Sequence, residues 1–363
     1  MVEVGGHRSQ STSAPRGFGR RVPPPCWHHG PVNPDDGAPE AGDAPAAFSG
    51  SRLGWRDLPR HVRERISSHA GAQVVAEVVA TSGFSPGFAG VLELADGHQV
   101  FVKAVSPAQN PHSPELARAE IRAAAAIPSS VHAPRLLWSS DDGEWVLLGF
   151  EAVVGRSPEL PWRPSDLERS LAAVVELSTA RPRAGHELPS MVDDVATSFT
   201  GWQSFAALSG SERAEIAERA GGLGAWAASR LDELVAWEQA APAASAGDRL
   251  VHGDLRADNI ILDPEHLWIV DWPHAAVGAP WLDLVCMLPS VAMQGGGAAH
   301  TLFEASPLSE GVSRDDLRAF VAGVTGFFTW GSFQPDPPGL PNLRGFQRAQ
   351  AYTAIAWLQE LAG

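Results

Sequence analysis

Cysteine is nearly absent from this chain of 363 residues, which carries only Cys26 and Cys286. A disulfide framework is therefore excluded, and such sparse thiols are typical of proteins from a reducing compartment. No uninterrupted apolar run approaches the roughly 20 residues that a membrane-spanning helix needs. The first residues also lack the basic, apolar and small-residue order of a signal peptide. We therefore expect a cytoplasmic protein without a membrane partner.

Positive charge is also scarce. The 27 Lys and Arg residues face 42 Asp and Glu residues, a net charge of −15. Such a balance argues against nucleic acid or an anionic membrane surface as a partner. It leaves open a cationic substrate or simply a solvated acidic surface. The hydrophobic content of 44% fits a globular protein with a core.

The first residues of the chain differ in composition from the rest. Residues 1–50 are dense in Pro, Gly, Ala and Asp and have neither helical nor strand periodicity, which predicts a disordered tail. A helix is then expected in "GWRDLPRHVRERISSHAG", where apolar residues recur at three- and four-residue steps. These features place the start of the ordered chain near residue 51.

Residues 51–150 have the pattern of a small antiparallel sheet. Five strands are expected in "VVAEVVAT", "FAGVLELA", "QVFVKAV", "PRLLW" and "EWVLLGF". The turn residues Asp96-Gly97 and Asp141-Asp142-Gly143 join two pairs of them as hairpins. Between the third and fourth strands, "SPELARAEIRAAAAI" predicts one inserted helix, with Ser113 as its cap. This part is expected to form an N-terminal lobe.

From residue 160 the pattern becomes helical. "SDLERSLAAVVELS" opens with Ser165 and Glu168, the spacing of a capping box. A long helical stretch over "SERAEIAERAGGLGAWAASRLDELVAWEQAA" is expected to break at Gly221-Gly222, and two further helices are expected near the end of the chain. The sequence therefore predicts an α+β fold, with a β-rich N-terminal lobe and a larger, mainly helical lobe over residues 151–363.

The clearest candidate chemistry lies in "LVHGDLRADNIILD", residues 250–263, and in the "LWIVDW" that follows. The turn sequence "DPEH" predicts a hairpin, which would place Asn259 opposite Val270 and therefore beside Asp271. Asp254 lies in the loop just before this hairpin. Such oxygen-bearing side chains suit Mg²⁺, which needs one or two protein oxygens when phosphate and water complete its octahedron.

"HGDLRADN" followed by "IVDW" closely resembles the catalytic loop and metal-binding Asp of aminoglycoside phosphotransferases and related small-molecule kinases. The resemblance covers roughly residues 70–360. It implies a protein-kinase-like bilobal fold, with ATP or GTP and Mg²⁺ as cofactors. The roles that it implies are a catalytic base, Asp254; two Mg²⁺ ligands, Asn259 and Asp271; and three supports of the catalytic loop, His252, Arg256 and Asp283. Pro273 and His274 stand where many relatives have a second acidic residue, so one or two metal ions remain possible.

Lys103 in "QVFVKAV" shares one strand face with Phe101 and Val105. A lysine beside apolar neighbours needs an anionic partner. Glu120 on the inserted helix is one candidate, and Glu115, near the start of the same helix, is the rival. The kinase resemblance adds the phosphates of ATP as a second partner of Lys103.

Two further segments complete the expected nucleotide site. The loop "TSGFSPGFAG" precedes the second strand and would cover the phosphates, with Ser85 and Gly87 as candidate residues. Its glycines alone are a weak signal, because glycines also mark ordinary turns. "GFEAVVG", residues 149–155, falls where the lobes meet. It is expected to hold adenine through backbone groups of Glu151 to Val153.

Parts of the sequence also fit three other functions. "GFSPG" matches the nucleophile elbow of hydrolases, but Pro86 has no N–H for an oxyanion hole and a strand is expected to follow. A protein kinase would need an activation loop, and only 11 residues separate Asp271 from Asp283. A nucleotide-binding pseudokinase or a binding protein without transferase activity stays as the alternative.

The expected function is therefore that of an ATP-dependent phosphotransferase with an alcohol group of a small molecule as acceptor. Its acceptor pocket should lie between the catalytic loop and the helices that follow residue 160. Asp193 and Asp194 could hold a cationic acceptor there, or could equally be helix-start or solvent residues. A monomer or weak dimer is expected.

Overall fold

The computed structural model describes residues 45, 47, 52–84, 86–219 and 221–363. The tail predicted for residues 1–50 lies almost entirely outside the described residues. The strands are β1 (Val74–Val79), β2 (Phe88–Leu94), β3 (Gln99–Val105), β4 (Leu136–Asp141), β5 (Val146–Glu151), β6 (Arg249–Val251), β7 (Ile260–Leu262), β8 (Leu267–Ile269) and β9 (Ala276–Gly278). The α-helices are α1 (Arg60–Ala70), α2 (Ser113–Ala126), α3 (Pro164–Leu177), α4 (Met191–Ser198), α5 (Gly201–Ala206), α6 (Gly210–Arg219), α7 (Gly221–Ser229), α8 (Leu231–Ala244), α9 (Leu282–Met293), α10 (Ala299–Glu304), α11 (Arg314–Ser332) and α12 (Leu343–Ala362). Short 3-10 turns cover η1 (Trp55–Asp57), η2 (Ala257–Asn259) and η3 (Pro307–Ser309).

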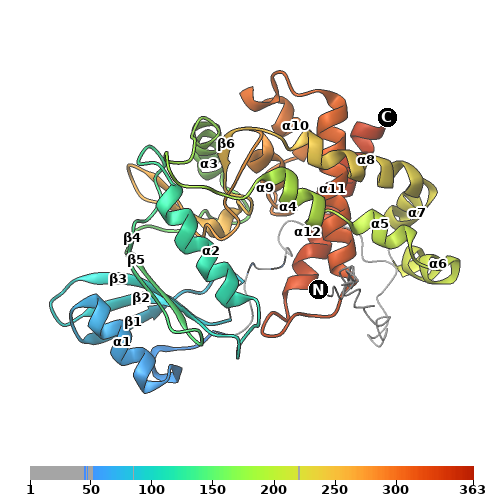
Figure 1. Cartoon of the computed structure of the whole chain (residues 1–363). Helices are drawn as coiled ribbons and strands as arrows, with labels where there is room; N and C mark the ends of the chain where they lie inside the picture. Colours follow the sequence, from blue (N-terminus) through green and yellow to red (C-terminus); the bar gives the residue numbers. More distant parts are fainter. Residues whose placement is uncertain (1–44, 46, 48–51, 85, 220) are drawn as a thin grey trace, which may run out of the picture. The chain divides into compact units, whose positions relative to one another are not determined.

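The first five strands form one antiparallel sheet in the order β1-β2-β3-β5-β4. Both predicted hairpins are present, and Gly97 and Gly143 have the positive φ that their turns require. Helix α1 packs on one face of the sheet and α2 packs on the other (Figure 1). The predicted α+β fold, with a small antiparallel sheet followed by a larger helical part, is confirmed.

The alternation along β3 decides which way its lysine points. Val102 and Ala104 belong to the core cluster that α1 covers, whereas Phe101 and Val105 pack in the cluster that α2 covers. Because side chains alternate across a strand, Lys103 shares the α2 face. The sheet therefore presents one ammonium group to the inserted helix.

Two predicted helix caps are wrong. Ser113 is the first residue of α2 rather than its cap, and α3 starts at Pro164, one residue before Ser165. Neither helix has a side-chain cap hydrogen bond at its start. A proline stands in the first turn of each helix, where its fixed φ favours helix initiation and its missing N–H is not needed. Proline, not a hydroxyl cap, sets these two boundaries.

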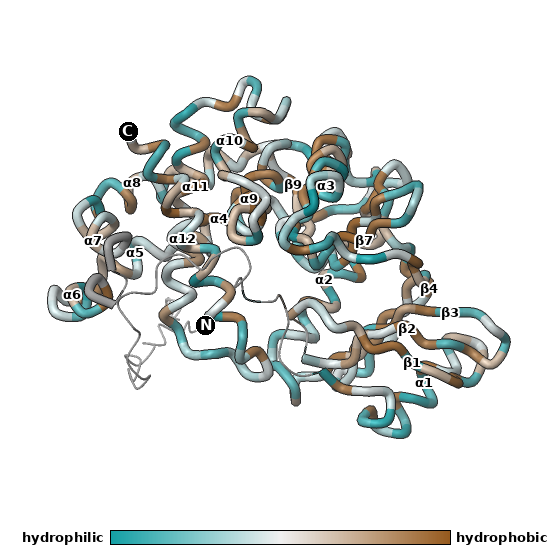
Figure 2. The backbone as a smooth tube through the Cα atoms, turned by 180° about the vertical axis from the view of Figure 1, so that it is seen from behind, coloured by the Kyte–Doolittle hydropathy of each residue, from teal (hydrophilic) through white to brown (hydrophobic). Residues whose placement is uncertain are grey.

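The helical part is organised around α11, which packs against α5, α8 and α12. Helix α9 packs on α12 and leads away from the catalytic loop (Figure 1). Residue 220, which separates α6 from α7, lies outside the described residues, so the break predicted at Gly221-Gly222 stays a prediction. Arg230 separates α7 from α8. Figure 2 shows hydrophobic residues along the strands and α9, whereas α6 is mainly hydrophilic. No helix in the described ranges is both long and apolar enough to cross a membrane.

Candidate active site

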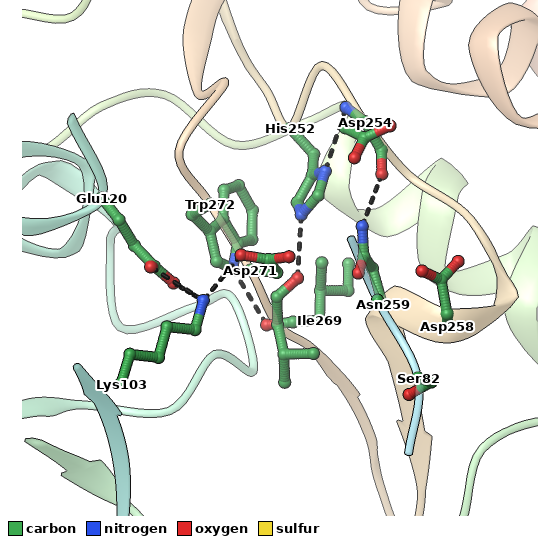
Figure 3. Close-up of polar contacts among 12 residues, drawn as sticks. Ser82, Lys103, Glu120, His252, Asp254, Asp258, Asn259, Ile269, Asp271 and Trp272 are labelled. Atoms are coloured by element: carbon green, nitrogen blue, oxygen red, sulfur yellow. Dashed lines mark hydrogen bonds and ion pairs between the residues drawn. The ribbon is translucent and has the colours of Figure 1, made fainter. Parts of the chain in front are cut away.

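Lys103 lies at the centre of an ion cluster that joins the sheet to the helical part. Its Nζ is 2.7 and 2.8 Å from the two carboxylate oxygens of Glu120 and 2.6 Å from Oδ1 of Asp271. The predicted Lys103–Glu120 pair is therefore present, and the rival Glu115 is exposed in the first turn of α2. In Figure 3, Asp271 lies between Lys103 and the residues of the catalytic loop.

Burial and charge act in opposite directions on this cluster. Burial lowers the pKa of Lys103, but the attraction of Asp271 and Glu120 outweighs it, so the pKa is raised. Burial raises the pKa of Asp271, yet the nearby Lys103 brings it down to about 2. Burial also raises the pKa of Glu120, and Lys103 opposes that change. Lys103 and Asp271 are therefore both charged at neutral pH.

Asp271 has an unusual backbone conformation. Its φ of 67° is the one positive value among the non-glycine residues that the structure describes. Left-handed backbone costs about 1–2 kcal/mol for most residues, although Asp and Asn tolerate it best. Burial raises the pKa of Glu120, and the backbone N–H of Trp272, the next residue, contributes to lowering it. Strain of this kind is concentrated at functional sites.

Asp283 of α9 holds the catalytic loop by accepting two hydrogen bonds from its backbone. Its Oδ2 accepts the N–H of His252 at 2.8 Å, and its Oδ1 accepts the N–H of Gly253 at 2.9 Å. Burial raises the pKa of Asp283 to about 6, although both hydrogen bonds lower it. Gly253 needs to be glycine because its φ is 80° and a Cβ would lie 2.6 Å from the carbonyl oxygen of His274.

His252 connects this loop to the strand segment before Asp271. Its Nε2 is 3.0 Å from the carbonyl oxygen of Val270, and its Nδ1 accepts the N–H of Asp254 at 3.2 Å. The ring packs edge-on against Trp272, with 4.6 Å between centroids. Complete burial lowers the pKa of His252 to about 4, so the imidazole is neutral at pH 7. A neutral ring can accept at one nitrogen while donating at the other.

The predicted hairpin brings Asn259 and Asp271 to the same end of β7 and β8. Strand β7 pairs with β8, and the N–H of Val270 donates to the carbonyl oxygen of Asn259 at 3.0 Å. The buried amide of Asn259 donates to the carbonyl oxygen of Asp254 at 2.7 Å. This bond fixes the amide and closes the loop over five residues.

Arg256 forms a second ion cluster within the loop. Its guanidinium pairs with Asp254 and makes two bonds of 3.0 Å to Asp258. It also lies near the rings of Phe84 and Phe346, at 5.6 and 5.7 Å from their centroids. The sequence did not indicate these two aromatic residues, because one precedes β2 and the other belongs to α12. Cation–π contacts of this kind hold the guanidinium in place.

The loop expected to cover the phosphates is described in part. Ser85 lies outside the described residues. Gly87 immediately precedes β2, and a Cβ there would lie 2.5 Å from the carbonyl oxygen of Ala104. Packing against β3 is therefore sufficient to explain this glycine. The strand that follows it is β2, which contradicts the helix that a nucleophile elbow would need.

The segment expected to hold adenine follows β5. The carboxylate of Glu151 accepts from Nε of Arg135 at 2.7 Å. The backbone N–H of Glu151 donates to the backbone carbonyl oxygen of Arg135. Val153 is partly exposed. Arg156 then forms a bridge with Leu262 of β7. The backbone of this segment therefore runs from the sheet to the hairpin of the catalytic region.

The two acidic residues considered for the acceptor lie at the start of α4. Asp193 and Asp194 are exposed in its first turn, and Ser190 caps the helix by accepting the N–H of Val192. Carboxylates are favoured at this position because they complement the helix dipole. Burial is the main cause that raises the pKa of the Cys286 thiol, and the charges of Asp283, Asp254 and Asp194 contribute in that order.

The two-part fold is that of a protein-kinase-like phosphotransferase. Residues 81–316 match the model of the phosphotransferase enzyme family, and the chain belongs to that family. The predicted enzyme class, a kinase or phosphotransferase with an alcohol group as acceptor, is confirmed. No curated protein sequence matches the chain.

Solved structures share the fold at low sequence identity. A thermostable mutant of aminoglycoside phosphotransferase APH(4)-Ia, in a ternary complex with ADP and hygromycin B, is 15% identical with a TM-score of 0.53. The match covers 83% of this chain and 97% of that one. Choline kinase LicA from Streptococcus pneumoniae is 13% identical with a TM-score of 0.51, covering 82% and 98%. These likenesses confirm the protein-kinase-like fold.

Proposed function

We propose that this chain transfers the γ-phosphoryl group of ATP to a hydroxyl group of a small polar molecule, with Mg²⁺ as the metal. The observation that carries the proposal is the cluster in which Lys103 contacts both Glu120 and Asp271. This cluster joins the Lys103 ammonium group on the sheet to the Asp271 carboxylate, which follows the hairpin of β7 and β8. This arrangement suits a nucleotide whose phosphates lie between the two parts.

The donor atoms beside this cluster fit a phosphate-supported Mg²⁺ ion. Asn259 and Asp271 would hold the metal, since amide and carboxylate oxygens are the hard ligands that Mg²⁺ prefers. No group of three or more His, Cys, Asp or Glu side chains suited to a metal exists among the described residues. Phosphate and water would therefore supply the remaining ligands, as is usual for this ion. When bound, Mg²⁺ neutralises charge on the phosphate oxygens.

Asp254 is the residue proposed to act on the acceptor. Its carboxylate would orient the hydroxyl and take its proton as the new P–O bond forms and the β–γ bridging bond breaks. ADP leaves with the bridging oxygen. Burial raises the pKa of Asp254, although the adjacent Arg256 opposes this change. A raised carboxylate pKa favours the role of a general base. Lys103 would neutralise phosphate charge throughout.

Substrate identity belongs to the same proposal. The ADP and hygromycin B complex of the APH(4)-Ia structure supports a nucleotide and a polyhydroxylated acceptor for this fold. The choline kinase among the solved structures supports small amino alcohols equally. A cationic acceptor agrees with the net charge of −15. ATP rather than GTP is the proposed donor.

The test compares the purified wild type with Asp254→Ala, Asp271→Ala and a surface control, Asp248→Ala. ADP release is measured with Mg-ATP or Mg-GTP against aminoglycosides, other antibiotics and amino alcohols. We expect Asp254→Ala to lower transfer by at least about 10²–10⁴-fold while it keeps nucleotide binding. Asp271→Ala should lose Mg-ATP affinity, and Asp248→Ala should behave as the wild type.

Two results would count against the proposal. Full transfer by Asp254→Ala would show that this carboxylate is not the base. Bound ATP without transfer to any acceptor would favour the alternative, a nucleotide-binding pseudokinase or binding protein. Absence of Mg-ATP binding by the wild type would overturn the nucleotide site itself.

A further inference from the structure

A short segment before α1 lies along the loop between β1 and β2. The N–H of Gly83 donates to the carbonyl oxygen of Ala47 at 2.7 Å, and the N–H of Leu53 donates to that of Gly87 at 3.3 Å. Between these contacts, Nη2 of Arg52 donates to the carbonyl oxygens of Ser82 at 2.8 Å and Gly83 at 3.1 Å. The guanidinium is therefore fixed against the loop expected to cover the phosphates.

Arg52 has no carboxylate partner within ion-pair distance in the part of the chain that the structure describes. Its Nε is buried and has no hydrogen-bond partner there either. Burial lowers the pKa of Arg52, and the carboxylate of Asp271 opposes this change. A partly buried cation without a carboxylate is unfavourable unless another anion binds it.

The other cations of the site are already matched. Lys103 contacts two carboxylates, those of Glu120 and Asp271, and Arg256 contacts two more. A triphosphate that enters this site adds several negative charges to an array that is already acidic. A further cation is therefore needed, and Arg52 has no carboxylate at ion-pair distance among the described residues, although the charge of Asp271 acts on it from farther away.

We infer that Arg52 binds the phosphate chain of the nucleotide, as a second cation beside Lys103. This inference rests on the proposed function, because it assumes that ATP occupies the site. Arg52 lies outside residues 81–316, the stretch that matches the family model. Its planar guanidinium keeps donors for phosphate oxygens while Nη2 remains on the loop carbonyls. The segment before α1 thus becomes part of the nucleotide site.

The test measures the affinities of Mg-ATP, ADP and adenosine by isothermal titration calorimetry on the full chain. Arg52→Gln and Arg52→Lys are compared with Arg56→Gln, which removes the same charge from an exposed residue of the same segment. We expect Arg52→Gln to weaken Mg-ATP about tenfold or more, equal to about 1.4 kcal/mol. Its adenosine affinity should equal that of Arg56→Gln. Arg52→Lys keeps the charge but loses the planar guanidinium and its paired donors. We therefore expect an intermediate loss of Mg-ATP affinity.

Thermal unfolding of each variant shows whether it is folded, and Arg52→Lys decides the question if Arg52→Gln is not. The inference is overturned if the Arg52 variants bind Mg-ATP as tightly as Arg56→Gln. It is also overturned if the affinities for Mg-ATP and adenosine fall by the same factor, because Arg52 would then only stabilise the loop and not bind phosphate. Failure of the wild type to bind Mg-ATP would instead overturn the proposed function, and this inference with it.

Discussion

Lys103 Nζ lies 2.6 Å from Oδ1 of Asp271, although 168 residues separate the two in the chain. This contact connects β3 of the sheet to the residue that follows the hairpin of β7 and β8. It exists because Asp271 adopts a left-handed backbone while Glu120 holds the same ammonium from α2. A nucleotide that binds between the two parts must share Lys103 with both carboxylates.

A double-mutant cycle on Lys103 and Glu120 should show strong coupling. Lys103→Met leaves the carboxylate of Glu120 buried without its cation, so we expect a loss of about 3 kcal/mol in the free energy of unfolding. Adding Glu120→Gln should restore part of this loss, because Asp271 is then the one carboxylate of the cluster left without its cation. Urea unfolding measures all four proteins. The exposed pair Arg60 and Glu64 is the control and should show no measurable coupling. Additive losses at Lys103 and Glu120 would contradict the buried pair.

Asp283→Asn tests whether α9 positions the catalytic loop. A carboxylate accepts both the N–H of His252 and that of Gly253, whereas an amide offers one oxygen and turns an NH₂ toward the second donor. We expect the loop to shift, with kcat falling at least about tenfold and stability falling by about 1–3 kcal/mol. Steady-state kinetics and urea unfolding measure these changes. Asp248→Asn at the surface is the matched control, and unchanged kcat in Asp283→Asn would rule out this role.

Local pattern was sufficient to predict the centre of the site. The hairpin that brings Asn259 beside Asp271 follows from a turn sequence between two short apolar runs, and strand alternation placed Lys103 on the face of α2. Both relationships depend on residues close in sequence or on a strand followed at once by its helix. The same kind of signal failed at Ser113 and Ser165, because adjacent prolines determine where those helices start.

Contacts between distant segments could not be predicted in this way. Phe84 and Phe346 meet at Arg256 only because α12 returns to the loop before β2. Arg52 reaches the same loop from a segment that has no motif and no periodicity. In such cases tertiary packing, not local propensity, chooses the partner. The sequence therefore indicated the chemistry of the site but not all of the residues that surround it.

His252 should make the protein less stable in mild acid. Its folded pKa of about 4 lies below the value of about 6.5 expected for an unfolded chain. Between these pH values the unfolded state binds more protons, so the free energy of unfolding falls as pH decreases from about 6.5 to about 4. Relative to His252→Gln, the wild type should lose up to about 3 kcal/mol across this window. Urea unfolding at several pH values measures the difference. Asp283, whose pKa is raised to about 6, changes the free energy of unfolding in the opposite direction over this pH range. Because Asp283 is present in both proteins, the difference between them reports the effect of His252. A difference that does not change with pH would contradict a buried neutral imidazole.

Gly253→Ala should disable the loop for a steric reason that Gly97→Ala does not share. Both glycines have a positive φ, 80° and 84°, so both substitutions cost about 1–2 kcal/mol in backbone conformation. An alanine at Gly97 meets nothing within 4 Å, whereas the Cβ at Gly253 would lie 2.6 Å from the carbonyl oxygen of His274. The loop must therefore move away from that carbonyl, which shifts the neighbouring Asp254. We expect Gly253→Ala to lower kcat by at least about 10²-fold, as a misplacement of about 1 Å can do, while Gly97→Ala keeps full activity and loses only stability. Kinetics and thermal unfolding of the two variants measure this contrast. Equal activities would mean that the loop tolerates the displacement and that the position of Asp254 is not critical for transfer.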